Sequence, residues 1–303
     1  MTIQNSLKFH IKRQFQAHKT RVRSINISQD SRNALTTSDD GLLKLWDVES
    51  FHEERVFIGH TDWIRFGLFT KDMEHILSAS DDFSVRVWHI LGAEDPIILR
   101  NHIGRVMCLA LIDNKHVLSS AYDRKIFMWD ITNGELVGEF LGHKGWVTRL
   151  AILSNQRLLS SCSDGTLKLW DMADFSSIGD FPGNQGKHRG IHSIAVSTDK
   201  AIAVSGSGSG ELKVWDVSSC SELTSVLAHT SAITEVAIMA NDNYLLSISE
   251  DGYLKIWSFP FLGQIFEVHF DTALTSLAIV PGRNIILVGN YEGWITECTI
   301  DTN

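Results

Sequence analysis

Short alternations of apolar and polar residues run along the whole chain. Segments 22–28 (VRSINIS) and 234–240 (TEVAIMA) show β-branched and apolar residues alternating with polar ones. Glycine, aspartate, asparagine and serine interrupt such runs about every 8 to 12 residues, and no stretch of helical periodicity is long enough to matter. The pattern predicts antiparallel strands joined by tight turns.

One segment of this pattern recurs at a nearly constant period. It ends in tryptophan at positions 46, 88, 129, 170, 215 and 257, with spacings of 42, 41, 41, 45 and 42 residues. A degenerate seventh copy places Cys298 at 41 residues after Trp257. A histidine precedes each of these seven positions by 27 to 29 residues: His18, His60, His102, His143, His188, His229 and His269. The chain therefore consists of seven repeats.

At these residues the chain resembles the WD-repeat (WD40) family of β-propellers, whose unit runs from a Gly-His to a Trp-Asp dipeptide. Only repeats two and four have the full Gly-His, and Trp-Asp is replaced by Trp88-His89 and Trp257-Ser258. The resemblance covers residues 7–300. It implies an all-β, seven-bladed propeller of four-stranded antiparallel blades, each repeat supplying the outer strand of one blade and the inner three of the next. We expect residues 7–15 to pair with the last blade and close the ring, which removes exposed sheet edges.

Composition fits one large repetitive domain over residues 1–303. Hydrophobic residues make up 44% of the chain and only 4 residues are proline, which excludes disorder and collagen-like structure. We place the repeats at about 16–49, 58–91, 100–132, 141–173, 186–218, 227–259 and 267–300.

Four residue types recur in register: the histidine, a hydroxyl, an aspartate and the tryptophan. Five repeats carry the full set: His18, Thr36, Asp40, Trp46; His60, Ser78, Asp82, Trp88; His102, Ser119, Asp123, Trp129; His143, Ser160, Asp164, Trp170; and His229, Ser247, Asp251, Trp257. A single Ser, His and Asp meeting in space would indicate a hydrolase. Five copies beside five tryptophans favour a structural network that satisfies each buried indole N–H, the role these residues have in the resembled family.

Charge and cysteine content exclude several kinds of partner and site. The net charge of −9 disfavours nucleic-acid binding. The four cysteines stand singly, which predicts a reducing cytoplasmic or nucleocytoplasmic compartment rather than secretion. No apolar run has the length of a signal peptide or a membrane span, and we expect no catalytic, cofactor or metal site.

Other residues predict a binding face at one end of the central channel. Trp63 and Trp146 follow the repeat histidine by three residues, where the resembled family opens on the channel, and Arg21 and Arg105 hold the same position in repeats one and three. The residue before the turn aspartate faces that surface in the family: Asp39, Asp81, Tyr122, Ser163 and Glu250, with Tyr291 in repeat seven. The longer connection around residues 180–187 leads onto the same face. Isolated surface aromatics can also lack any function.

The resemblance implies a non-catalytic scaffold that docks partner proteins or peptides on this channel-end face, alone or as a subunit of a larger complex. An alternative is a reader of a modified peptide or small ligand, for which Trp63, Trp146, Asp39 and Asp81 supply an aromatic and acidic channel mouth. An enzyme would need an unrepeated set of convergent polar groups in the channel, and the sequence offers none.

Overall fold

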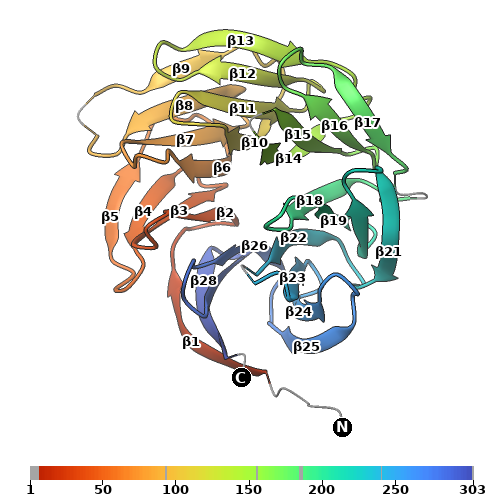
Figure 1. Ribbon diagram of the computed structural model, residues 1–303. Coiled ribbons are helices and arrows are strands. Elements are labelled where there is room, and N and C mark those ends of the chain that lie inside the picture. Colours follow the sequence, from red (N-terminus) through yellow and green to blue (C-terminus); the bar gives the residue numbers. More distant parts are fainter. Residues whose placement is uncertain (1–6, 93, 155, 184–186, 240, 302–303) are drawn as a thin grey trace.

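The computed structural model describes residues 7–92, 94–154, 156–183, 187–239 and 241–301. Within them, strands form seven four-stranded antiparallel sheets arranged as blades around a central axis (Figure 1). The predicted seven-bladed propeller is confirmed. The predicted start of the fifth repeat at residue 186, the middle of the connection at 180–187 and the two chain ends of the predicted domain lie outside the described residues.

Blades 1 to 4 take their strands from the chain in order. They are β2 (Val22–Ile27), β3 (Asn33–Ser38), β4 (Leu43–Asp47), β5 (Glu53–Phe57); β6 (Ile64–Phe69), β7 (His75–Ser80), β8 (Ser84–His89), β9 (Ile97–Arg100); β10 (Val106–Leu111), β11 (His116–Ala121), β12 (Ile126–Asp130), β13 (Glu135–Phe140); and β14 (Val147–Ser154), β15 (Arg157–Cys162), β16 (Leu167–Asp171), β17 (Ser177–Phe181).

Blades 5 to 7 follow the same order, and the last blade takes its outer strand from the chain start. They are β18 (Ile191–Val196), β19 (Ile202–Ser207), β20 (Glu211–Asp216), β21 (Ser221–Leu227); β22 (Ile233–Ile238), β23 (Tyr244–Ser249), β24 (Tyr253–Ser258), β25 (Gln264–His269); and β26 (Leu274–Ile279), β27 (Ile285–Asn290), β28 (Trp294–Asp301) with β1 (Lys8–Gln16).

Strand β1 closes the ring as predicted. It pairs antiparallel with β28, from Lys8 opposite Asp301 to Gln16 opposite Trp294, so the first and last strands of the described chain lie side by side (Figure 1). Its apolar side chains also reach the neighbouring blades: Phe9 stacks on Phe266 of blade 6, with 5.3 Å between ring centroids. The closing strand therefore supports three blades, because Phe15 contacts Trp46 of blade 1.

The hydrophobic core lies between adjacent blades. One cluster joins Leu77 and Val85 of blade 2 to Val106 and Leu109 of blade 3, each side chain at most 2% exposed. Every second strand of a blade has the same nearly complete burial, because both of its faces pack against neighbouring blades. This packing makes the ring a rigid support for loops at its ends.

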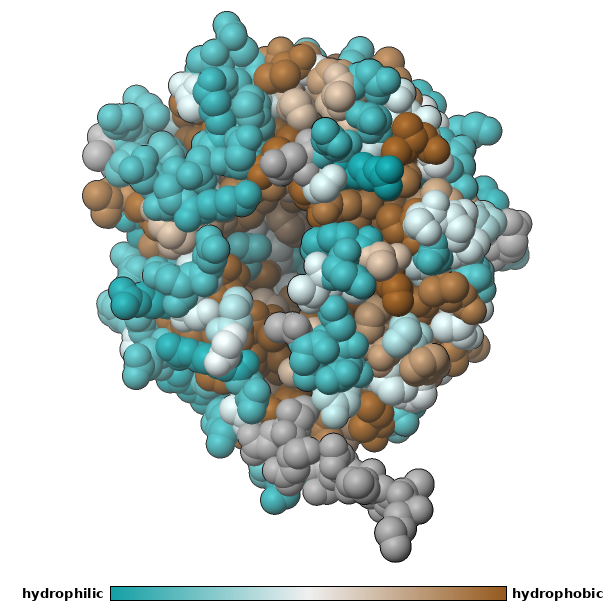
Figure 2. All heavy atoms as spheres, viewed as in Figure 1, coloured by the Kyte–Doolittle hydropathy of each residue, from teal (hydrophilic) through white to brown (hydrophobic). Residues whose placement is uncertain are grey.

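Each innermost strand carries a β-bulge at its second residue. The register shifts there in all seven blades, at Arg23, Arg65, Met107, Thr148, His192, Thr234 and Thr275. A bulge residue has no ladder partner and its side chain is re-aimed, here toward the channel. Figure 2 shows the hollow at the centre of the ring, seen on one face of the molecule.

Candidate binding site at the channel mouth

The repeated quartets form hydrogen-bonded chains beneath the channel-end face. In blade 3, Trp129 Nε1 donates to Ser119 Oγ at 2.8 Å, and Ser119 Oγ lies 2.8 Å from His102 Nε2. The other ring nitrogen of His102 lies 2.7 Å from Asp123 Oδ2. Blades 1, 2 and 6 have the same chain from indole to carboxylate.

These chains hold the two loops that form the face. Asp123 accepts hydrogen bonds from the backbone N–H of Ile103, in the loop entering blade 3, and of Lys125, in the turn between β11 and β12. Burial opposes its ionisation, but the bond to His102 lowers the pKa of Asp123, so the carboxylate is charged at neutral pH. Each quartet thus fixes a loop and a turn together.

Blade 4 departs from the predicted network. His143 Nε2 lies 2.6 Å from Ser160 Oγ, but His143 Nδ1 is buried and has no hydrogen-bond partner among the described residues. Asp164 is instead bonded by the backbone and hydroxyl of Thr166 and by the Cys162 thiol, which occupies the position of a serine in blades 1, 2 and 6. Burial and the charge of Lys168 lower the pKa of His143 to about 4. The expected His143–Asp164 bond is therefore wrong.

Two positions of each blade meet at the face through one backbone hydrogen bond. The residue before the turn aspartate donates its N–H to the carbonyl of the residue just before the innermost strand. This bond joins Asp39 to Arg21, Asp81 to Trp63, Tyr122 to Arg105, Ser163 to Trp146 and Tyr291 to Ala273. The candidate residues therefore lie on the same face in pairs.

Side-chain contacts then link these pairs from blade to blade. Arg21 lies over Tyr291 of blade 7, Trp63 beside Arg23 of blade 1, and Arg105 Nε lies 3.5 Å from Asp81 Oδ2 of blade 2. Trp146 stacks on Tyr122 of blade 3 with a centroid distance of 4.0 Å and an interplanar angle of 5°. We call this continuous set the rim arc: Tyr291, Arg21, Asp39, Arg23, Trp63, Arg65, Asp81, Arg105, Tyr122 and Trp146.

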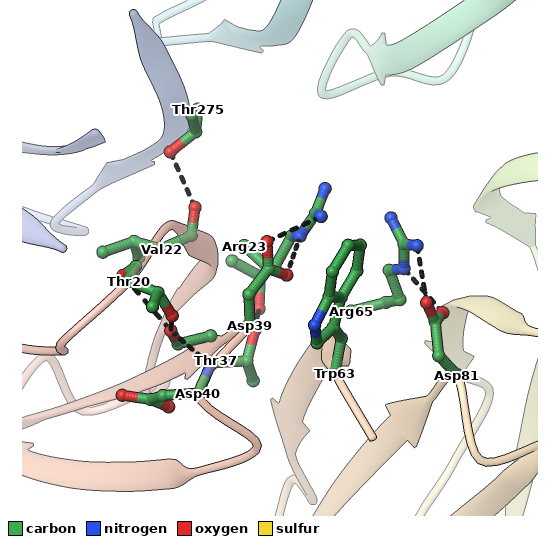
Figure 3. A network of polar contacts seen from close by, with 12 residues as sticks. Thr20, Val22, Arg23, Thr37, Asp39, Asp40, Trp63, Arg65, Asp81 and Thr275 are labelled. Carbon is green, nitrogen blue, oxygen red and sulfur yellow. Dashed lines mark hydrogen bonds and ion pairs between the residues drawn. The ribbon is translucent and has the colours of Figure 1, made fainter. Parts of the chain in front are cut away.

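Trp63 lies between two arginines, as Figure 3 shows. The guanidinium carbons of Arg23 and Arg65 are 5.1 and 5.3 Å from the Trp63 ring, within cation–π range. Arg65 binds Asp81 through two hydrogen bonds of 2.7 and 2.6 Å, and Arg23 binds Asp39 in the same bidentate way. Trp63 is still 40% exposed and Trp146 48%, so the arc is held in place but accessible.

The two aspartates of the arc do not offer their carboxylates to a partner. The Asp81 side chain is 1% exposed and engaged by Arg65 and Arg105. Burial opposes the charge on Arg65, but its hydrogen bonds to Asp81 raise the pKa of Arg65. Asp39 is bound by Arg23 in the same way. The expectation that Asp39 and Asp81 supply an acidic channel mouth is therefore wrong, because both carboxylates pair with arginines of the rim arc.

The rim arc borders a cavity of about 780 Å³ in the channel. All seven bulge residues line it, together with Arg21, Arg149, His188 and Glu250. Desolvation by the surrounding protein and the charges of Arg149 and Arg21 lower the pKa of His192 to about 4, so this imidazole is neutral at pH 7. Arginines thus give the cavity its charge.

The sequence analysis missed the bulge residues. Their signal is a column five residues after the repeat histidine in five blades: Arg23, Arg65, Met107, Thr148 and Thr234. The residue type at this position of the repeat varies from blade to blade. Only the strand register shows that these side chains face the channel.

Other kinds of site are not found in the described part of the chain. No group of three or more histidine, cysteine, aspartate or glutamate side chains there is placed to hold a metal ion. The described residues also contain no helix with the length and hydropathy needed to cross a membrane.

The fold and the buried quartets define the class of protein: a closed seven-bladed β-propeller in which blades 1, 2, 3 and 6 carry a complete Trp–hydroxyl–His–Asp network. The family profile "WD domain, G-beta repeat" (WD40) matches residues 9–47, 51–89, 96–130, 134–171, 176–216 and 220–258, and the chain belongs to this family. Each matched segment contains the outer strand of one blade and three strands of the next, as the sequence analysis predicted.

The curated relatives share only part of their length with this chain. Periodic tryptophan protein 2 of Arabidopsis thaliana is 27% identical over 36% of this chain and 12% of its own length. Pre-mRNA-processing factor 19 of Caenorhabditis elegans is 25% identical over 33% of this chain and 19% of its own. Eukaryotic translation initiation factor 3 subunit I of Culex quinquefasciatus is 25% identical over 33% of this chain and 30% of its own.

Proposed function

We propose that this chain is a non-catalytic scaffold that docks partner proteins or peptides on the rim arc, as a subunit of a larger assembly. WD40 propellers generally act as protein-interaction scaffolds. The single observation that carries the proposal is the set of exposed aromatic rings of the arc, Trp63, Trp146 and Tyr291, held on a rigid ring by ion pairs and stacking. Tryptophan, tyrosine and arginine are the residues most enriched among interface anchors.

The burial of the quartet hydroxyls supports a non-catalytic role. Thr36, Ser78, Ser119, Ser160 and Ser247 are all 0% exposed, and each accepts the hydrogen bond of a tryptophan. A nucleophile must reach its substrate, and these hydroxyls cannot.

Charge, cysteines and relatives support the setting of this scaffold. The net charge of −9 argues against a nucleic-acid partner, and we propose no membrane insertion. Cys108, Cys162, Cys220 and Cys298 are free, which fits a cytoplasmic or nucleocytoplasmic compartment. One relative is named as a subunit of a translation initiation factor, which supports membership of an assembly.

Substitution of the two tryptophans tests the proposal. A partner is first co-purified from native lysate, identified by mass spectrometry and titrated against the purified chain. Trp63→Ala and Trp146→Ala should each weaken binding by about 2 kcal/mol, roughly 30-fold in Kd, because a few large anchors dominate an interface.

The matched control is Phe261→Ala, an aromatic side chain 82% exposed in the loop between β24 and β25. It should leave both binding and melting temperature unchanged. Unchanged binding of the two tryptophan variants, or their unfolding in place of a loss of binding, would contradict docking on the rim arc.

A further inference from the structure

The lining of the channel cavity is cationic although the chain is acidic. Arg21, Arg23, Arg65 and Arg149 line it against one glutamate, Glu250, while the chain carries a net charge of −9. The carboxylates that neutralise Arg23 and Arg65, Asp39 and Asp81, are not among the described residues that line the cavity. Because these two arginines are paired, the positive charge left for a ligand comes from Arg21 and Arg149, against the single negative charge of Glu250.

Arg21 has unused hydrogen-bonding capacity. Its Nε is buried and has no hydrogen-bond partner among the described residues, whereas the Nε atoms of Arg23 and Arg65 donate to carboxylates. Burial and the charge of Arg23 lower the pKa of Arg21 to about 10, so it stays charged at neutral pH. A charged guanidinium with an unsatisfied buried N–H is costly, and because Arg21 lines the cavity, an anion that enters it can pair with this guanidinium.

We infer that the channel mouth receives an acidic side chain of the docked peptide, which pairs with Arg21 while the peptide backbone lies across the aromatic rings of the rim arc. This inference rests on the proposed docking function and names the chemistry of its partner. The fork of an arginine suits a carboxylate or a phosphate equally, so the anion is a glutamate, an aspartate or a phosphorylated residue. Charge complementarity with the arginine-lined cavity selects it.

Selection from a phage-displayed library of random short peptides tests the inference with the full chain. Peptides selected by the wild type should carry aspartate or glutamate at one common position. Synthetic copies with glutamine there should bind about tenfold or more weakly, and the difference should shrink at high salt. Copies with phosphoserine show which anion is preferred: tighter binding than glutamate supports the inference with phosphate as the source.

Variants at Arg21 connect this preference to the channel. Arg21→Gln should abolish the difference between glutamate and glutamine peptides, and Arg21→Lys should retain part of it. The control is Arg283→Gln, an exposed arginine in the turn between β26 and β27, which should keep the full difference. Melting curves of all three variants show whether each remains folded.

The outcomes separate this inference from the proposed function. Peptides without acidic enrichment, or an acidic preference that survives Arg21→Gln, overturn the acidic anchor. Docking on the rim arc still stands if Trp63→Ala and Trp146→Ala weaken binding of the selected peptides. Peptides that bind these two variants as tightly as the wild type overturn the docking function itself. Failure to select any peptide overturns the inference.

Discussion

The bulge residues of blades 1 and 2 and those of blades 4, 6 and 7 occupy the same backbone position but do different work. Thr148, Thr234 and Thr275 donate hydrogen bonds to carbonyls of the next blade, at Ile191, Leu274 and Val22, with distances of 2.6 to 2.9 Å. Arg23 and Arg65 instead bind carboxylates of their own blades. On one side of the channel, which we call the threonine side, neutral hydrogen bonds join neighbouring blades. On the other, the arginine side, the bulge residues form ion pairs.

On the arginine side, accessible side chains take the place of the direct hydrogen bonds that join neighbouring blades on the threonine side. On the arginine side, blades 1 to 4 meet at the face through Trp63, Arg105 and the Tyr122–Trp146 stack, side chains that remain partly exposed. On the threonine side the ties are buried hydroxyls. A binding surface and a structural seam thus share one ring.

Removal of Asp81 is expected to break the arginine side with the largest effect. Asp81→Ala leaves Arg65, a side chain only 10% exposed, without its counter-charge, which should lower the free energy of unfolding by about 3 to 5 kcal/mol in urea denaturation. The matched control is Asp180→Ala, because Asp180 is 66% exposed and its pair with Lys168 should contribute less than about 1 kcal/mol. Equal losses in the two variants would show that the arginine side does not depend on buried charge.

Glu235, on the threonine side, tests whether a buried group there must be uncharged for full stability. Burial, against the opposing charge of Arg149, raises the pKa of Glu235 to about 7, and its Oε2 accepts a hydrogen bond from Leu277 N of blade 7. Between pH 4.5 and about 7 the folded chain keeps a proton that the unfolded chain has lost, so this group lowers stability as pH rises.

Glu235→Gln keeps the accepting oxygen and removes the charge. It should therefore stabilise the protein by about 1 to 3 kcal/mol at pH 8 and change it little at pH 5. Thermal melts of both proteins across this pH range measure the difference. A variant less stable than the wild type at pH 8 would mean that the carboxylate charge supports the seam between blades 6 and 7.

The smallest effect is expected at a single threonine tie. Thr275→Val keeps the shape of the side chain but loses the hydrogen bond to Val22 O, which should cost about 1 kcal/mol in urea denaturation. The control Thr198→Val, at an exposed position, should stay within about 0.5 kcal/mol of the wild type. If the two variants are equally stable, the bulge threonines do not hold the blades together.

The fold could be predicted from the sequence because many residues recur at nearly the same spacing from repeat to repeat. Seven histidines and six tryptophans in step leave little freedom in blade number, and the unmatched segment before His18 leaves one place for the closing strand. The same column reasoning placed Arg21, Trp63, Arg105 and Trp146 on one arc.

The sequence could not show which of several nearby side chains an aspartate would bind. Asp164 has the right spacing from His143, but the Cys162 thiol and Thr166 engage it first. Asp81 reads as a surface acid because nothing in the sequence shows that Arg65 and Arg105 converge on it from two blades.

The seven bulges place one side chain per blade on the wall of the channel, outside the strand pairing. A bulge residue belongs to no rung of its strand pair, so exchanging its side chain leaves the pairing of the blade intact. Methionine, histidine, threonine and arginine already occupy these positions on nearly identical backbones. Strand pairing therefore does not restrict which side chains line the channel, although the arginines and threonines among them also stabilise the blades. A propeller with another set of seven side chains at these positions would bind a different ligand on the same fold.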